Sequence, residues 1–196
     1  MTAIDHRRAV AERNRAAILD AVEQLLTDRQ PLNMVALAQA AGVSRPTLYS
    51  HFKTLSEVME AAVERAVVNS LSALQAAEPE VGPADEALGR MIEASWQHLA
   101  KLDGLARGAA EHLPAERLHH AHGPLMALTI GVIKRGQADG VFRDDLPPEW
   151  LTRVYVALVH AADEMARSRG GNRKQALPIL KTSLLDLLRF QGGKSR

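Results

Sequence analysis

The chain of 196 residues carries 24 Lys and Arg against 23 Asp and Glu, a formal net charge of +1, so bulk charge gives no argument for nucleic-acid binding. It has no cysteine, which excludes disulfide scaffolds, thiolate zinc sites and cysteine nucleophiles. Hydrophobic residues make up 46% but aromatics only 4%, a balance that favours helices packed through aliphatic side chains over sheets.

No apolar stretch of signal-peptide type follows Met1. The longest nearly apolar run, 124–133, is too short to span a bilayer. We therefore expect a soluble, cytoplasmic protein without membrane contact.

Helical periodicity dominates and no alternating strand pattern is evident, so we predict an all-α fold of nine helices. The first helix is predicted over 5–28 and is ended by Pro31 and Asn33. Its N-terminal part is basic, with Arg7, Arg8, Arg13 and Arg15.

Two short helices are predicted over 35–41 and 45–52, on either side of the tripeptide Gly-Val-Ser. Thr54 and Glu57 form a capping box that opens a long helix over 54–77. The Glu/Pro/Gly stretch at 78–83 is the best candidate for a boundary, as a short connector.

Beyond this connector we predict an amphipathic helix over 85–102 and a short one over 105–112. A longer helix ends at Gly140, a typical glycine stop. The acids and prolines at 144–148 suit the first turn of the next helix, which runs to about 168. A last helix is predicted over 174–190.

The segment from Val35 to Phe52 meets the requirements of a helix-turn-helix motif. Such a motif needs a small residue where the helices cross, a residue tolerant of positive φ in the turn, an apolar anchor, and a cap for the second helix. It also needs apolar residues on the facing sides of both helices. The residues that fill these positions are Ala38, Gly42, Val43 and Ser44, with Leu37, Ala41, Leu48 and Phe52 on the facing sides.

The outward face of the second short helix is polar and serves no core. Its residues are suited to contacts with DNA: Arg45, Pro46, Thr47, Tyr49, Ser50, His51 and Lys53. Arg45, at the start of the helix, is best placed to reach a base edge, and Pro46 can contact a thymine methyl. The alternative for Arg45 is a solvated surface arginine.

The run VSRPTLYSHFKTLSE at 43–57 resembles the signature of the TetR (tetracycline-repressor) family, as does the segment GVFRDD at 140–145. One departure is at 31–35, where the family usually has a threonine cap and this chain has Asn33, which can cap in its place. The resemblance implies a two-domain fold, with a DNA-binding domain at 1–53 and a ligand-binding and dimerisation domain at 54–196, in which helix 54–77 is the connecting helix.

The same resemblance implies a regulator without enzymatic activity or cofactor. It would bind a pseudo-palindromic double-stranded DNA operator as a homodimer and, in most such proteins, act as a repressor released by a small-molecule effector. By resemblance, Thr47, Tyr49, His51 and Lys53 match positions that contact the DNA backbone. The basic N-terminal arm is expected to add phosphate or minor-groove contacts.

The last two helices carry apolar stripes, for which a core and a dimer interface are both natural explanations. In the TetR family these helices form a four-helix interface, so the resemblance favours the interface. The residues concerned are Trp150, Val154, Leu158 and Met165, then Leu177, Leu180, Leu184 and Leu188, with Leu185 and Leu187 widening the second stripe.

A ligand site would be enclosed by the helices between 85 and 140. The candidate lining residues are Trp96, His98, His112, His122 and Met126, because an apolar cavity with a few polar anchors is typical of small-molecule sites. The alternative is that Trp96 and Met126 fill a closed core.

Glu116, His119, His120 and His122 lie within seven residues and raise a second hypothesis, a helical metal-assisted hydrolase. Adjacent histidines on a helix point about 100° apart, and only His119 and His122 share a face, so at most a partial site results. Solvated surface histidines are the alternative, and we predict no metal site. No H-E-x-x-H motif, nucleophile elbow or phosphate loop supports an enzyme.

Overall fold

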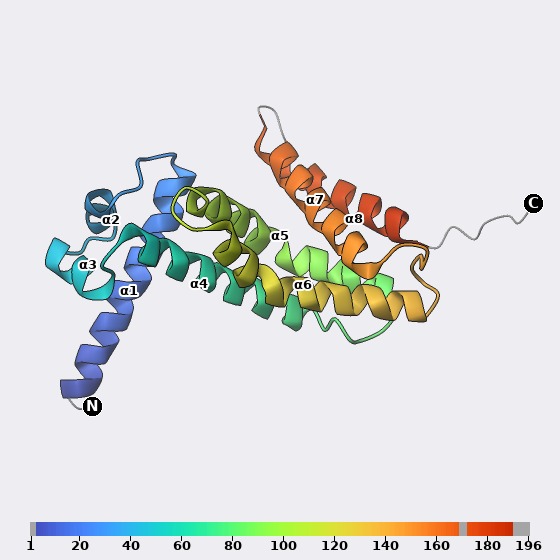
Figure 1. Ribbon diagram of the computed structural model, residues 1–196, viewed down its shortest axis with the longest axis horizontal. Helices are drawn as coiled ribbons and strands as arrows, with labels where there is room; N and C mark the ends of the chain where they lie inside the picture. The colour runs from blue at the N-terminus through green and yellow to red at the C-terminus, as the bar shows by residue number, and fades with distance from the viewer. Residues whose placement is uncertain (1–2, 169–171, 190–196) are drawn as a thin grey trace, which may run out of the picture. The chain divides into compact units, whose positions relative to one another are not determined.

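The computed structural model describes residues 3–168 and 172–189, and these residues form helices without a named β-strand. An isolated antiparallel bridge pairs Phe142 with Arg189. The all-α fold predicted from the sequence is confirmed. The helices are α1 (Ala3–Thr27), α2 (Met34–Ala40), α3 (Arg45–His51), α4 (Leu55–Ala76), α5 (Ala84–Ala109), α6 (Ala115–Ala138), α7 (Pro148–Arg167) and α8 (Arg173–Leu188) (Figure 1).

The helices predicted over 85–102 and 105–112 are one continuous helix, α5, so the described residues form eight named helices where nine were expected. Gly104 lies between the two predicted helices, and glycine costs about 1 kcal/mol relative to alanine inside a helix. On either side of it, Leu102 and Leu105 are only 4% and 2% exposed. Burial of one leucine stabilises by about 1.5–3 kcal/mol, which outweighs the glycine penalty.

Helix α6 stops where the sequence predicts, because Gly140 adopts a left-handed backbone with φ +69°. Helix α7 begins at Pro148 and not at the acids before it. Asp145 instead receives two hydrogen bonds of 2.7 Å from the Arg143 guanidinium, which hold the pKa of its carboxyl below the ordinary value. The predicted last residue of the final helix, Phe190, lies outside the described residues.

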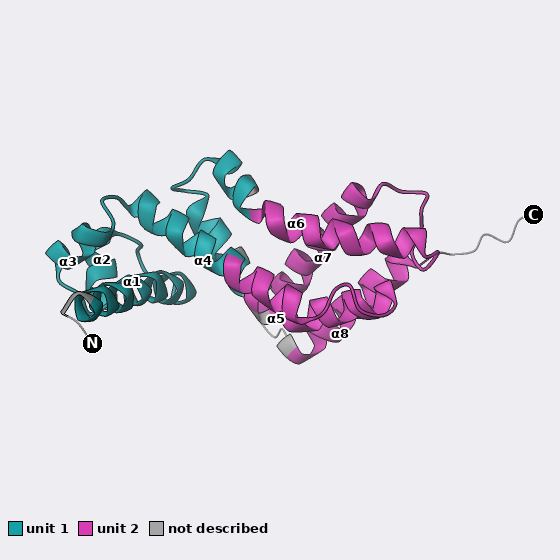
Figure 2. Ribbon diagram, turned by 90° about the horizontal axis from the view of Figure 1, so that it is seen from below, with its two compact units in different colours: residues 1–67, 101–121 teal, residues 68–100, 122–196 magenta. Residues whose placement is uncertain are grey.

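The chain packs into two compact units that are discontinuous in sequence (Figure 2). Unit 1 consists of Met1–Val67 and Lys101–Ala121, and unit 2 of Val68–Ala100 and His122–Arg196. Helices α4, α5 and α6 each contribute to both units. The domain boundary expected after residue 53 separates DNA binding from ligand binding and dimerisation, and it does not describe compact packing units. It stays a prediction.

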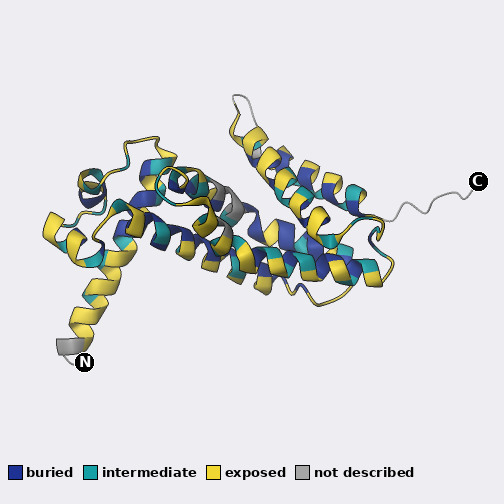
Figure 3. Cartoon of the chain, viewed as in Figure 1, coloured by how far each residue is buried: buried dark blue, intermediate teal, exposed yellow. Residues whose placement is uncertain are grey.

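The core of unit 1 lies around the second half of α1. Ile18, Leu19 and Val22 are at most 1% exposed, and they lie on one face of the helix. The first half of α1 has no such face, since its described residues from Asp5 to Ala17 are exposed or half-buried (Figure 3).

In unit 2, helices α7 and α8 pack against each other through apolar side chains at helical spacing. The buried side chains are Leu151, Tyr155, Val159 and Ala162 on α7, and Ala176, Leu180, Leu184 and Leu188 on α8. None of the described helices combines the length and the apolar character needed to cross a membrane.

Candidate nucleic-acid interface

Helices α2 and α3 form the helix-turn-helix that the sequence predicts, and both pack against α1. Leu37 and Leu48, on the facing sides of the two helices, are fully buried. Ala38 and Phe52 are 5% and 4% exposed, so the small crossing residue and the closing aromatic lie in the core as expected.

The turn between the helices uses the predicted residues. Gly42 has φ +65°, a conformation that strains any residue with a Cβ atom. The amide of Val43 donates to the carbonyl of Ala38 at 3.0 Å. Ser44 is the N-cap of α3 and accepts from the Thr47 amide at 3.2 Å. Asn33 caps α2 in the same way, accepting from the amides of Val35 and Ala36.

The outward face of α3 is open to solvent. Arg45, Pro46, Tyr49, Ser50 and Lys53 are exposed, and Thr47 and His51 are half-buried. The Tyr49 side chain is large and 45% exposed, so its ring is open to a ligand. The predicted DNA-contacting residues therefore share one accessible surface, which we call the reading face.

Three residues of the reading face are held by local hydrogen bonds. The Thr47 hydroxyl lies 2.7 Å from the Ser44 hydroxyl, and the Ser50 hydroxyl donates to the Thr47 carbonyl at 2.7 Å. The Lys53 ammonium donates to the Tyr49 carbonyl at 2.8 Å, at the C-terminal end of α3. Arg45 makes no hydrogen bond or ion pair with any residue that the structure describes, so its guanidinium is available to a ligand.

A capping box joins the reading helix to α4. Thr54 Oγ1 accepts from the amide of Glu57 at 3.2 Å, as the sequence predicts. The carboxylate of Glu57 reaches back to the amide of Lys53 at 2.7 Å, one residue before the cap. Two orphan amides are thus satisfied at the point where α3 ends and α4 begins.

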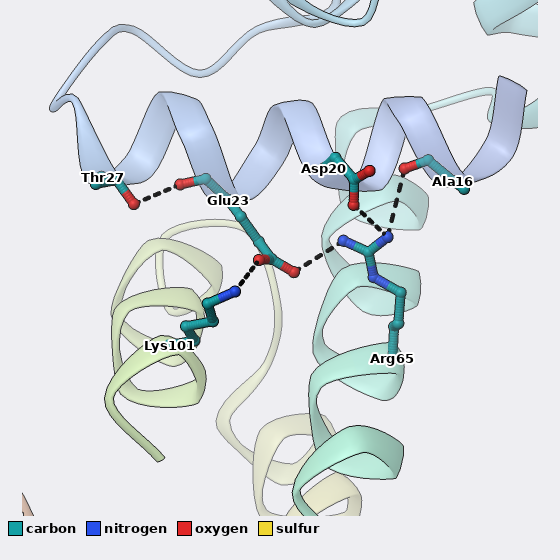
Figure 4. Close-up of polar contacts among 6 residues, drawn as sticks. All are labelled: Ala16, Asp20, Glu23, Thr27, Arg65 and Lys101. Carbon is teal, nitrogen blue, oxygen red and sulfur yellow. Dashed lines mark hydrogen bonds and ion pairs between the residues drawn. The ribbon is translucent and has the colours of Figure 1, made fainter. Parts of the chain in front are cut away.

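A cluster of charges that the sequence analysis missed ties α4 to α1 (Figure 4). Arg65 donates to Asp20 Oδ1 and Glu23 Oε1, both at 2.8 Å, and Lys101 donates to Glu23 Oε2 at 3.4 Å. The side chains of Arg65 and Glu23 are 24% and 25% exposed, so this pair is poorly screened. The spacing of Asp20 and Glu23 was a usable signal, since residues three apart share a helix face.

The segment Lys101–Ala121 also contacts α4 and α1 within unit 1. The Ser56 hydroxyl donates to the His112 carbonyl at 3.1 Å, and Arg117 pairs with Glu60. At Gly108 there is no room for a side chain, because a Cβ atom would meet Leu26 of α1. Arg15 of α1 lies over the Phe52 ring at 5.4 Å, so one predicted basic residue is used within the protein.

The predicted dimer residues of α7 lie on a partly uncovered stripe of the chain. Trp150 and Met165 are 55% and 37% exposed, and Val154 and Leu158 are half-buried. On α8, Leu177 is half-buried, as are Leu185 and Leu187. Leu180, Leu184 and Leu188 are at most 2% exposed, so they have no surface left to bury against a partner. For Leu180, Leu184 and Leu188 the burial therefore favours the explanation that they belong to the core of the chain and not to a dimer interface.

The five candidate ligand residues are divided between the two units. Trp96, His98, His122 and Met126 belong to unit 2, and His112 belongs to unit 1. Trp96 is 5% exposed and the other four are half-buried. That these residues line one small-molecule site stays a prediction.

Among the residues that the structure describes, no group of three or more His, Cys, Asp or Glu is placed to hold a metal ion. His120 is exposed in unit 1 and His122 is half-buried in unit 2, while the side chain of His119 is outside the described set. The hydrolase hypothesis gains no support from these positions.

Known proteins with this arrangement are transcriptional regulators. The HTH-type transcriptional repressor LfrR of Mycolicibacterium smegmatis is 29% identical over 184 residues, covering 94% of this chain and 95% of LfrR. The HTH-type transcriptional regulator NfxB of Pseudomonas aeruginosa is 27% identical over 165 residues, covering 81% of this chain and 86% of NfxB. No family model matches the chain.

Solved structures agree with this. The crystal structure of the TetR-like regulator LfrR in complex with proflavine matches with a TM-score of 0.72 and 27% identity, over 91% of this chain and 98% of that one. A TetR-family structure from Rhodococcus sp. shares the fold with a TM-score of 0.77 at 22% identity, over 89% of this chain and 98% of that one.

An exposed reading face on a complete helix-turn-helix, together with these similarities over nearly the whole chain, defines a DNA-binding transcriptional regulator. In sequence and fold the chain is similar to regulators of the TetR family.

Proposed function

We propose that this protein is a cytoplasmic, homodimeric repressor that binds a pseudo-palindromic operator and is released by a small-molecule effector. The observation that carries the proposal is the reading face, a row of solvent-accessible polar residues on a helix whose other face is completely buried. Its support among relatives is LfrR, a repressor whose crystal structure holds proflavine. We assign DNA binding to residues 1–53, and ligand binding and dimerisation to 54–196.

In the proposed complex, Arg45 reads a base edge in the major groove, and Thr47, Tyr49, His51 and Lys53 contact phosphates. The local hydrogen bonds of Thr47 and Lys53 support positioning roles, because they fix these side chains before DNA arrives. A bidentate contact from Arg45 to guanine contributes about 1–3 kcal/mol of discrimination. Half-sites would lie about 34–36 Å apart, one helical turn of DNA.

The test begins with selection of duplexes from a random library by the full-length protein, which is expected to return a two-fold repeated sequence. Fluorescence anisotropy then compares Arg45→Ala and Tyr49→Phe with Arg153→Ala, a matched exposed arginine on α7. We expect Arg45→Ala to weaken specific binding about 5- to 150-fold, the equivalent of 1–3 kcal/mol, without changing the circular dichroism. Specific binding that survives both reading-face changes would show that α3 is not the reading helix.

The partly uncovered stripe of α7 supports the homodimer. Trp150, Val154, Leu158 and Met165 follow one face of α7 and present apolar surface that water contacts in the single chain. Ile179 of α8, 51% exposed, adds apolar surface on the neighbouring helix. We propose that the interface uses these residues and Leu177, while Leu180, Leu184 and Leu188 stay in the core.

For the effector we propose a site among Trp96, His98, His122 and Met126 of unit 2. Tyr155 in the same unit supports this, because burial raises the pKa of Tyr155 to about 12, against a smaller opposing effect of the Ser95 hydroxyl. The phenol therefore stays protonated and can donate to a ligand. To weaken operator binding about a hundredfold, an effector must prefer the released dimer by about 2.7 kcal/mol.

A further inference from the structure

Arg135 of α6 carries a charge that the structure leaves uncompensated. Its Nε and Nη2 are enclosed, and neither has a hydrogen-bond partner among the described residues. No ion pair to Arg135 is found among these residues either. An enclosed donor without a partner costs about 1–3 kcal/mol, and more when the group is charged. A guanidinium in this state binds an anion more strongly than a fully hydrated one, because its charge is poorly screened.

Arg135 lines a groove of about 460 Å³ in unit 2. The other lining residues on α6 are Ala127, Leu128, Gly131 and Val132, which lie on the same helix face as Arg135. From Ala127 to Arg135 the helix rises about 12 Å, at 1.5 Å per residue. A Cβ atom built on Gly131 meets nothing within 4 Å, so the groove is open at its middle.

The opposite wall of the groove is Pro79 and Glu80, in the connector between α4 and α5. This connector is fixed by Arg90, which donates to the carbonyls of Ala77, Glu78 and Val81 at 3.0, 2.9 and 2.6 Å. Because the wall is pinned at three points, the groove is a preformed site. Glu80 is exposed to solvent, so its negative charge is screened.

We propose that this groove binds a small organic carboxylate with an apolar body, its carboxylate pairing with Arg135 and its body lying along Ala127, Leu128 and Gly131. One cation matches one negative charge, and the rest of the α6 wall is apolar. A phosphate dianion would need further donors, which the lining does not offer. The site is separate from the reading face and from the proposed effector residues, and its assay needs no DNA. Its outcome is therefore independent of the proposed function.

The test is isothermal titration calorimetry of the full-length protein with sodium octanoate. We expect saturable binding of one octanoate per chain, weaker binding of octan-1-ol, and no binding of octylamine. Arg135→Met should weaken octanoate binding at least tenfold, since loss of one charge-assisted contact exceeds 1.4 kcal/mol. Glu80→Gln should change octanoate binding less than about twofold, because the exposed Glu80 carboxylate is already screened by solvent.

Two further variants separate binding from folding. A Cβ atom fits freely at Gly131, so Gly131→Leu places its side chain in the groove and should abolish octanoate binding. Gly123→Leu, also on α6 and also open at its Cβ, should leave octanoate binding unchanged. Ligand-free Arg135→Met should melt about 2–4 °C higher than the parent, because two enclosed donors without hydrogen-bond partners are gone.

The proposal is overturned if octanoate shows no saturable binding, if octylamine binds equally well, or if Arg135→Met and Gly131→Leu keep the parent affinity. A lower melting temperature of Arg135→Met would also overturn it, since that result would mean that the guanidinium is already stabilised within the protein.

Discussion

Nη2 of Arg65 lies 2.8 Å from Oε1 of Glu23 and joins α4 to α1 within unit 1. Arg65→Met would leave Glu23 with Lys101 alone and Asp20 without its 2.8 Å partner. We expect unit 1 to lose about 1–3 kcal/mol, the cost of an unmet hydrogen bond to a charged group.

Urea denaturation followed by circular dichroism measures this loss. Arg8→Met is the matched control, because the Arg8–Glu12 pair is 82% and 68% exposed and contributes less than about 1 kcal/mol. Equal losses in the two variants would mean that the Arg65 cluster does not hold α4 against α1.

Gly136→Ala should destabilise unit 2. A Cβ atom at Gly136 would overlap the ring of Phe142, which is fully buried and cannot yield. Overpacking of this kind costs about 1–3 kcal/mol. Gly123→Ala, on the same helix, meets nothing within 4 Å and should stabilise slightly, through higher helix propensity. Thermal melts of both variants give the comparison, and a melting temperature of Gly136→Ala at or above the parent's would contradict the close packing seen here.

Leu158→Glu should convert the proposed dimer to a monomer. The substitution places a charge in the middle of the α7 stripe, where dimerisation would bury it without a partner. His160→Glu, two residues along and exposed, points about 160° away and should leave the dimer intact. Analytical ultracentrifugation at several concentrations distinguishes the two. If both variants remain dimeric, the interface lies elsewhere.

Proflavine should quench the fluorescence of Trp96 and weaken operator binding over the same concentration range. The chain has two tryptophans, so emission is measured in a Trp150→Phe background, where Trp96 is the sole emitter. Operator binding is measured with the parent chain, because Trp150 belongs to the proposed dimer interface. Trp96 is 5% exposed, so acrylamide is expected to quench it weakly and serves as the control. Release of DNA by proflavine with unchanged Trp96 emission would place the effector away from Trp96.

The turn and cap of the helix-turn-helix were predicted at the correct residues, and the ends of its helices to within one residue, because its requirements are local. Gly42 must adopt positive φ, Ser44 must cap, and Leu48 must face inward, and each requirement selects a residue type at a fixed spacing. The same locality explains the correct prediction of Asn33 as a cap.

The features that could not be predicted from the sequence depend on contacts between residues that are distant along the chain. Whether Gly104 breaks α5 was decided by the burial of Leu102 and Leu105, which no local pattern reveals. The apolar stripe of α8 predicts that the helix is buried, but not whether α7 or a second chain covers Leu180 and Leu184. Likewise, nothing near Arg135 in the sequence indicates that its guanidinium lacks a partner.

The discontinuity of unit 1 bears on how the protein is made. The reading helix, α3, ends at His51, yet the unit that contains it also includes Lys101–Ala121. During synthesis the first 67 residues leave the ribosome well before this second segment does. Until it emerges, the Ser56 hydroxyl has no His112 carbonyl, Glu23 no Lys101, and Leu26 no Gly108 to pack against. A nascent chain halted before residue 101 would thus contain every residue of the reading face on an incomplete support, and unit 1 is complete only once more than half of the polypeptide has been translated.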